Sequence, residues 1–240
     1  MNLTIDLGNS YCKILIFRDN DIMYRDVCKS LSTRYLQQLF KSFEIEYAMI
    51  SSVVSLKPEL KKQLKKYKVK EFKSSVKIPV KNLYTTPQTL GKDRLANAIA
   101  GSFLFPEENV LIIDAGTCLK FDFVNSKKQY KGGAISPGLS MRFIALNKLT
   151  DQLPLVEIKN PGKLIGNSTV TAIQAGVFNG MVEEIKGIIA RYKKEHGQLK
   201  VILTGGDAQR FAGQVNLSIF AASDLVNIGL NEIIKYNHSK

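Results

Sequence analysis

Apolar residues along this chain follow two spacings. Alternation or short runs predict strands, and recurrence every three or four positions predicts helices. In the first half, strands are predicted near residues 2–8, 12–18, 22–28, 47–54 and 69, and helices over 35–43, around Leu60 to Tyr67, and over 93–105. In the second half, strands are predicted near 109–114, 118–124, 129–135 and 201–203, and helices from Gly138 to about Leu149, from Ser168 or Thr169 to about His196, and from about Ser223. Three strands followed by helices and further strands occur twice, so we expect an α/β chain of two similar halves.

The long helix predicted to end at His196 has Gly197 as its expected stop. It carries an apolar stripe that is either core or a subunit interface, formed by Ile173, Val177, Ile185, Ile188 and Tyr192.

A short motif follows an apolar strand at matching places in the two halves. The first copy is Asp6-Leu7-Gly8-Asn9-Ser10 and the second is Asp114-Ala115-Gly116-Thr117-Cys118. A single Asp-x-Gly string is common in ordinary hairpins. Two copies at matching positions indicate that each half presents a carboxylate and a glycine turn to one cleft.

These turns carry groups that suit a nucleotide phosphate tail and its metal ion. Glycines such as Gly8 let a ligand approach the main chain. Short donors suit phosphate oxygens, and they are supplied by Asn9, Ser10 and Thr117. The Asp6 carboxylate suits a hydrated Mg²⁺ or another cation, and Lys13 follows the first turn as a point charge.

Length and composition limit the class of protein. A chain of 240 residues with 45% hydrophobic residues can bury a core of one large or two small domains. No apolar run approaches the length of a membrane span, and no basic leader precedes the first strand. Three widely spaced cysteines, Cys12, Cys28 and Cys118, form neither a metal-ligand pattern nor a disulfide framework. We therefore expect a cytoplasmic protein without a membrane partner.

The net charge of +13 raises the question of nucleic-acid binding. Much of it comes from lysines between Lys57 and Lys73, where Leu60, Leu64 and Tyr67 recur at helical spacing. That pattern is typical of the solvated face of a short amphipathic helix. No basic stripe is interleaved with aromatic residues for base stacking. We do not expect a nucleic-acid partner, and positive potential also attracts anionic substrates such as ATP.

The repeated plan resembles the actin-like ATPase superfamily, which includes sugar and acetate kinases. The resemblance implies two ribonuclease-H-like domains, over residues 1–107 and 108–240. Each would be a mixed five-stranded sheet flanked by helices, with the active site in the cleft between them. The string Leu203-Thr204-Gly205-Gly206 fits the adenosine loop of that superfamily, which places Gly205 and Gly206 among the expected ATP contacts. A Walker-type phosphate loop is absent from the sequence, so ATP would be held by the hairpin turns.

Six motifs occur in the order typical of type III pantothenate kinases, and the chain resembles that family over essentially its full length. The motifs are DLGNS, LGKDR, DAGTC, GGAISPG, TVTAIQAG and LTGG. The resemblance implies transfer of a phosphoryl group from ATP to the hydroxyl of pantothenate, the first step towards coenzyme A. It also implies Mg²⁺ with ATP, an activating monovalent cation (K⁺ or NH₄⁺) and a homodimer.

The resemblance assigns roles to individual residues. The segment from Asp6 to Lys13 matches the first ATP-phosphate loop, and Thr117 matches a further ATP contact. Asp93 matches the general base, and Asp114 matches a ligand of the monovalent cation. Pantothenate contacts are implied for Tyr84, Gly91, Lys92, Asp93, Arg94 and, across the dimer interface, Thr169. The chemistry agrees, because an alcohol needs an acceptor for its proton and the planar fork of arginine holds an anion.

The sequence departs from the family pattern at Lys120, where the family often has Thr. A lysine there is able to alter cation binding or to reach a phosphate. Two other functions stay open at this stage. One is a transcription-related accessory role, motivated by the charge, and the other is phosphorylation of a different small alcohol.

Overall fold

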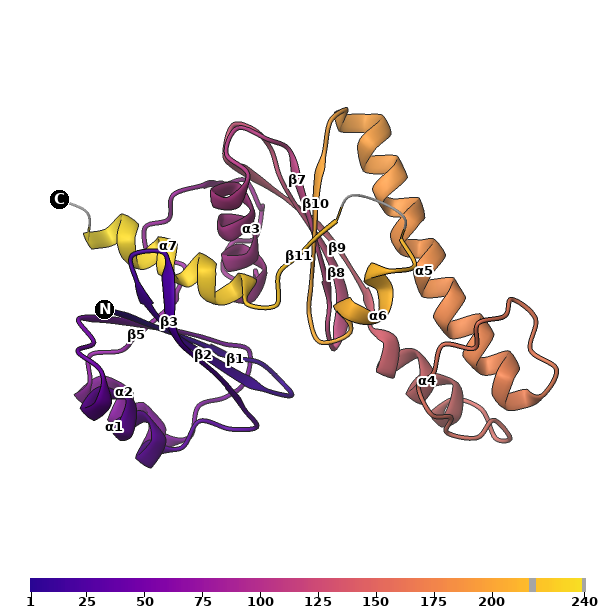
Figure 1. Cartoon of the computed structure of the whole chain (residues 1–240), viewed down its shortest axis with the longest axis horizontal. Helices are drawn as coiled ribbons and strands as arrows, with labels where there is room; N and C mark the ends of the chain where they lie inside the picture. Colours follow the sequence, from indigo (N-terminus) through magenta and orange to yellow (C-terminus); the bar gives the residue numbers. More distant parts are fainter. Residues whose placement is uncertain (216–218, 239–240) are drawn as a thin grey trace. The chain divides into compact units, whose positions relative to one another are not determined.

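The structure is a computed structural model that describes residues 1–215 and 219–238. It divides into two compact units. The first unit comprises Met1–Glu107, Val124–Gly132 and Asp224–Lys240, and the second comprises Glu108–Phe123 and Gly133–Ser223 (Figure 1).

A mixed five-stranded sheet forms the centre of the first unit, in the order β3-β2-β1-β4-β5. Its strands are β1 (Asn2–Leu7), β2 (Cys12–Arg18), β3 (Asp21–Cys28), β4 (Tyr47–Ser52) and β5 (Lys70–Glu71). β1 is antiparallel to β2 and parallel to β4. A short strand, β6 (Lys81–Asn82), is not part of this sheet; it is the edge strand of the other sheet, where it pairs in parallel with Gln129 and Tyr130.

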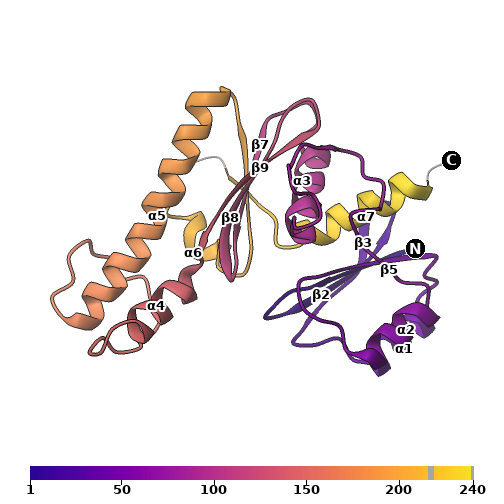
Figure 2. The same ribbon diagram turned by 180° about the vertical axis from the view of Figure 1, so that it is seen from behind.

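Helices cover both faces of this sheet (Figures 1 and 2). α1 (Thr33–Ser42) and α2 (Pro58–Lys66) lie on one face, and α3 (Lys92–Leu104) and α7 (Leu225–His238) lie on the other. Alternation along β1 explains the two layers. Leu3 and Ile5 join the core that also contains Leu36 of α1 and Leu60 of α2, whereas Thr4 contacts α7.

The last helix belongs to the first unit, which differs from the continuous ranges 1–107 and 108–240 predicted from the sequence. α7 packs tightly along α3 because Gly229 has no side chain. A Cβ there would lie 2.0 Å from the carbonyl oxygen of Ala96. The order of elements along the chain does not reveal that α7 packs on the first unit, because the contact between α7 and α3 joins residues far apart in sequence.

The other sheet has the order β11-β10-β7-β8-β9-β6, with the short β6 at its edge. The strands are β7 (Val110–Ala115), β8 (Cys118–Val124), β9 (Gln129–Pro137), β10 (Lys200–Thr204) and β11 (Ile219–Ala221). β7 is buried along its whole length and pairs in parallel with β10, which pairs in parallel with β11. The α/β class with two mixed sheets flanked by helices is therefore confirmed.

The helices in the described part of the second unit are α4 (Leu139–Lys148), α5 (Thr169–His196) and α6 (Ala208–Ala212). α5 begins at a capping box in which Ser168 and Thr171 each satisfy the other's main-chain N–H group. It ends at Gly197, whose φ of 73° favours glycine.

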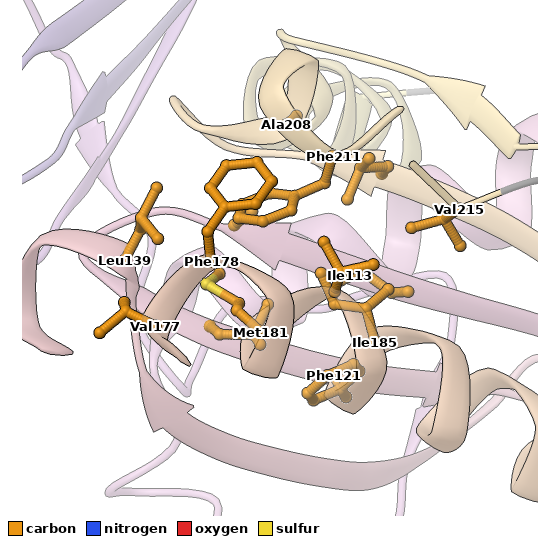
Figure 3. Packing of buried hydrophobic residues seen from close by; sticks show 14 of the residues in the cluster. Ile113, Phe121, Leu139, Val177, Phe178, Met181, Ile185, Ala208, Phe211 and Val215 are labelled. Carbon is orange, nitrogen blue, oxygen red and sulfur yellow. The ribbon is translucent and has the colours of Figure 1, made fainter. Parts of the chain in front are cut away.

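The core of the second unit lies under α5 (Figure 3). Phe178, Met181 and Ile185 of this helix pack in one cluster with Ile113 and Phe211. The predicted stripe on α5 is therefore core, with Ile173 and Val177 in the same cluster and Ile188 and Tyr192 packed against it. Within residues 1–215 and 219–238, no helix has both the length and the apolar character needed to cross a bilayer.

Candidate functional site

The first hairpin joins β1 to β2 in the first unit. Asp6 lies opposite Lys13 in the ladder, and the N–H of Gly8 donates to the carbonyl of Tyr11 at 3.0 Å. Asn9 and Ser10 form the exposed tip. The structure thus places all five predicted residues of the first phosphate loop around one turn, with the short donors facing solvent where a ligand can reach them.

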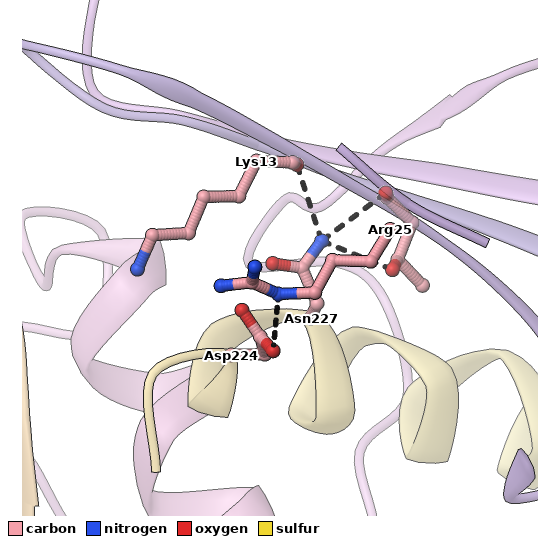
Figure 4. Close-up of polar contacts among 5 residues, drawn as sticks. Lys13, Arg25, Asp224 and Asn227 are labelled. Carbon is pink, nitrogen blue, oxygen red and sulfur yellow. Dashed lines mark hydrogen bonds and ion pairs between the residues drawn. The ribbon is translucent and has the colours of Figure 1, made fainter. Parts of the chain in front are cut away.

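Helix α7 fixes the base of this hairpin (Figure 4). The buried Nδ2 of Asn227 donates to the carbonyl and the Oγ1 of Thr4, both at 3.1 Å, and to the carbonyl of Lys13 at 3.3 Å. Beside it, Nε of Arg25 donates to Asp224 at 2.9 Å. The main chain of Lys13 is held while its side chain extends away from Asn227. Sequence reasoning missed Asn227, although an amide on an apolar helical face was a signal.

The second hairpin joins β7 to β8 in the second unit. The N–H of Gly116 donates to the carbonyl of Cys118 at 3.1 Å. The Asp114 carboxylate is nearly buried, and its Oδ2 lies 2.8 Å from Nζ of Lys120 on β8. This is a charge-assisted contact between two largely shielded groups, so salt and water screen it less than they screen an exposed ion pair.

The Gly205-Gly206 turn packs directly on this second hairpin. Gly205 has a φ of +96°, and a Cβ there would lie 2.4 Å from the carbonyl carbon and oxygen of Ala115 and 2.6 Å from Oδ1 of Asp114. The N–H of Asp207 donates to the Ala115 carbonyl at 2.9 Å. Only glycine fits position 205, and the turn brings Gly205 and Gly206 beside the predicted phosphate loop.

The start of α3 carries four of the predicted substrate residues. Gly91 is the N-cap, and Asp93 lies in the first turn, where the helix dipole favours a carboxylate. Oδ1 of Asp93 lies so close to Gly91 that a Cβ on residue 91 would be 2.6 Å away. Arg94 is 4% exposed, and its guanidinium carbon lies 5.8 Å from the centre of the Tyr84 ring. The structure therefore brings Tyr84, Gly91, Asp93 and Arg94 together.

Lys92 holds the loop that precedes this helix. Its Nζ donates to Oγ of Ser74 and to the carbonyl of Leu90, both at 3.0 Å. Burial lowers the pKa of the Lys92 ammonium from its ordinary value. In this structure the predicted substrate residue Lys92 orders the main chain around Gly91.

Thr169 lies at the exposed start of α5 and lines an apolar groove of about 850 Å³ between α4 and α5. Leu146, Leu149 and Ile173 contribute to its walls, and Arg142 lies at its edge. Arg142 pairs with Glu184 of α5, and the same carboxylate accepts from Oγ of Ser136 at 2.6 Å. Arg142 and Glu184 were not predicted from the sequence, since their pairing joins distant segments.

Each of these two turns carries a single carboxylate that could ligate a metal ion, Asp6 in the first unit and Asp114 in the second. Over the described part of the chain, no group of three or more His, Cys, Asp or Glu side chains is arranged to hold a metal ion. This arrangement fits Mg²⁺ that arrives with nucleotide, because Mg²⁺ in kinases commonly uses one or two carboxylates plus phosphate oxygens and water.

The fold is shared with proteins of known structure that include sugar kinases. A glucokinase from an Antarctic psychrotroph has a TM-score of 0.55 at 10% identity, covering 98% of each chain. A conserved protein from Campylobacter jejuni, assigned to the Baf family of transcriptional activators, has a TM-score of 0.62 at 23% identity, also covering 98% of each chain. These likenesses show a shared fold.

Sequence comparison narrows the class further. The model of the type III pantothenate kinase family matches residues 2–191. A type III pantothenate kinase from Phocaeicola vulgatus is 43% identical over 239 residues, which cover 99% of both chains. This chain therefore belongs to the type III pantothenate kinase family.

Proposed function

We propose that the protein transfers the γ-phosphoryl group of ATP to the hydroxyl of pantothenate, giving 4'-phosphopantothenate in the first step of coenzyme A biosynthesis. The observation that carries this proposal is the 43% identity to a type III pantothenate kinase along essentially the whole chain. The LGKDR string of the resemblance stands at the start of α3, at residues 90–94.

The nucleotide is assigned to the three glycine turns. Gly8, Asn9, Ser10 and Lys13 of the first hairpin and Thr117 of the second would hold the phosphates, and Gly205 with Gly206 would line the adenosine. Asp6 is the carboxylate assigned to Mg²⁺ bound with ATP. Mg²⁺ would neutralise charge that develops on the phosphates during transfer. The turns would supply main-chain N–H groups and short side-chain donors that need little rearrangement.

The acceptor is assigned to the start of α3. Asp93 would accept the proton of the pantothenate hydroxyl as that oxygen attacks phosphorus. A strong base is not required, because positioning and charge neutralisation dominate phosphoryl transfer. The Arg94 guanidinium suits the pantothenate carboxylate, Gly91 and Lys92 would shape the loop around it, and Tyr84 would contact the substrate.

We also propose a homodimer in which Thr169 of one protomer completes the pantothenate site of the other. The groove beside Thr169 is apolar, and Leu149, Leu164 and Ile165 in the same unit are each at least 80% exposed. When exposed apolar side chains gather in one patch, the patch often marks a protein–protein contact. Leu164→Lys should shift sedimentation from dimer to monomer and reduce turnover. Unchanged sedimentation of both Leu164→Lys and Leu149→Lys would remove this surface from consideration.

A cytoplasmic location is proposed as well, since all three cysteines are free, as is typical of a reducing compartment.

The test is a coupled assay for ADP release with ATP, Mg²⁺ and pantothenate, with phosphopantothenate identified by mass spectrometry. Asp93→Asn should lower kcat by about 10²- to 10⁴-fold, whereas the exposed Asp151→Asn should leave it unchanged. Full turnover by Asp93→Asn would exclude this base.

A sugar phosphorylated in preference to pantothenate would overturn the proposed substrate. Sequence-selective, salt-sensitive DNA binding would favour the alternative suggested by the charge of +13.

A further inference from the structure

The Lys120–Asp114 ion pair changes the chemistry expected at the second hairpin. Nζ of Lys120 lies 2.8 Å from Oδ2 of Asp114, and the two side chains are only 16% and 12% exposed. The other carboxylate oxygen, Oδ1, faces the glycine turns. Cβ atoms on Gly116 and Gly205 would lie 3.2 Å and 2.6 Å from it. One oxygen therefore contacts an ammonium, and the other is enclosed by main chain.

A monovalent cation does not fit this arrangement. The family resemblance assigns Asp114 to K⁺ or NH₄⁺, but here its carboxylate already has a cation at hydrogen-bond distance. A second monovalent ion on Asp114 would lie beside the ammonium with one carboxylate to balance both charges. Repulsion between them is weakly screened, because both side chains of the pair are largely shielded from water.

We propose that the Lys120 ammonium takes the place of the activating monovalent cation, so that this chain works without K⁺ or NH₄⁺. This inference rests on the proposed function. The lysine head group is an alkylated ammonium ion, so it carries the same unit charge as K⁺ and offers three N–H donors where NH₄⁺ offers four. It balances the Asp114 carboxylate beside the phosphate loop.

Tethering explains why a lysine is an effective substitute. A free ion must be captured from solution, and its occupancy depends on its concentration. A side chain already placed by β8 is present at a high effective concentration and loses less freedom when the contact forms. The positive charge at Asp114 is then independent of the salt in the medium.

The principal experiment compares wild-type protein with Lys120→Thr and Lys200→Thr in tetramethylammonium chloride, with and without KCl at constant ionic strength. Lys200 also forms an ion pair in the second unit, with Glu108 at 3.5 Å. It lies at the opposite end of β10 from Thr204, which pairs with Asp114, so it is a matched control. Wild-type and Lys200→Thr protein should turn over pantothenate equally with and without KCl.

Lys120→Thr should lose about tenfold to a hundredfold of its turnover without KCl and should recover most of it with KCl or NH₄Cl. A wild-type enzyme that needs KCl would overturn the inference. So would a Lys120→Thr variant with a raised KM for ATP that KCl does not restore, because that pattern assigns Lys120 to a phosphate. Absence of turnover by wild-type protein with pantothenate in every salt would instead refute the proposed function.

A second measurement does not depend on turnover. Crystals of wild-type and Lys120→Thr protein grown in rubidium chloride should differ in anomalous scattering. A rubidium peak is expected beside Asp114 in the variant and not in the wild type. A peak at this place in wild-type crystals would overturn the inference even if the variant failed to fold.

Discussion

The Asp93 carboxylate lies directly beside the α-carbon of Gly91, and a Cβ on residue 91 would be 2.6 Å from its Oδ1. The clash would involve the end of a flexible side chain and not the main chain. Gly91→Ala should therefore rotate Asp93 away from its position with little change in stability. We expect kcat to fall about a hundredfold, since small displacements of reacting groups are costly.

Steady-state kinetics and urea unfolding test this prediction together. Gly187→Ala is the control, because a Cβ there contacts nothing within 4 Å and alanine favours a helix interior. Wild-type kcat in Gly91→Ala would show that the position of Asp93 does not limit transfer.

Adjacent glycines in the adenosine turn should respond very differently to the same substitution. Gly205→Ala places a Cβ 2.4 Å from the Ala115 carbonyl at a φ of +96°, so we expect a loss of about 2–5 kcal/mol in unfolding free energy. Gly206→Ala meets nothing within 4 Å and should be nearly neutral. Urea unfolding measures both, and equal losses would contradict the packing described for this turn.

Removal of the Asn227 amide should weaken the first unit. Asn227→Ala deprives the buried main chain at Thr4 and Lys13 of a shared donor, and we expect a loss of about 1–3 kcal/mol. Asn237, on the exposed side of the same helix, donates to the carbonyl of Lys77 at 2.8 Å. Asn237→Ala should cost less than about 0.5 kcal/mol. Calorimetric melting that ranks the two variants in the opposite order would refute this role for Asn227.

Thiol chemistry should distinguish the three cysteines. Burial raises the pKa of the Cys12 thiol, with a further contribution from Cys28 on the neighbouring strand, and only the thiolate reacts readily. Maleimide labelling at pH 8, followed by peptide mass spectrometry, should modify the partly exposed Cys118 well before Cys12. In urea the two should react at similar rates. Early labelling of Cys12 in the folded protein would contradict its burial.

The sequence predicted the larger elements because their signals are local. Ser168 and Gly197 mark the ends of α5 through capping chemistry that involves only neighbouring residues. The short elements β6, β11 and α6 were missed. Two to five residues carry no measurable periodicity, and the short strands exist only because distant strands supply their hydrogen bonds.

The candidate site follows the same division. Gly8, Asn9, Gly205 and Asp93 were recognisable from motifs, each of which is a continuous string. Contacts that cross between segments were not recognisable, such as the ion pair of Lys120 with Asp114. The side-chain conformation that brings Lys120 to Asp114 on the neighbouring strand depends on packing. The spacing of these residues in the sequence does not predict that conformation.

The return of α7 to the first unit constrains how the chain is made. Residues 224–238 pack with the first unit, and Asn227 donates to the main chain of the strand that precedes the first phosphate loop. During synthesis, the ribosome therefore releases β1 and β2 long before the segment that completes their layer exists. The first unit reaches its full set of contacts only after α7 emerges. Fusion partners or truncations at the end of the chain should therefore act on the amino-terminal nucleotide loop.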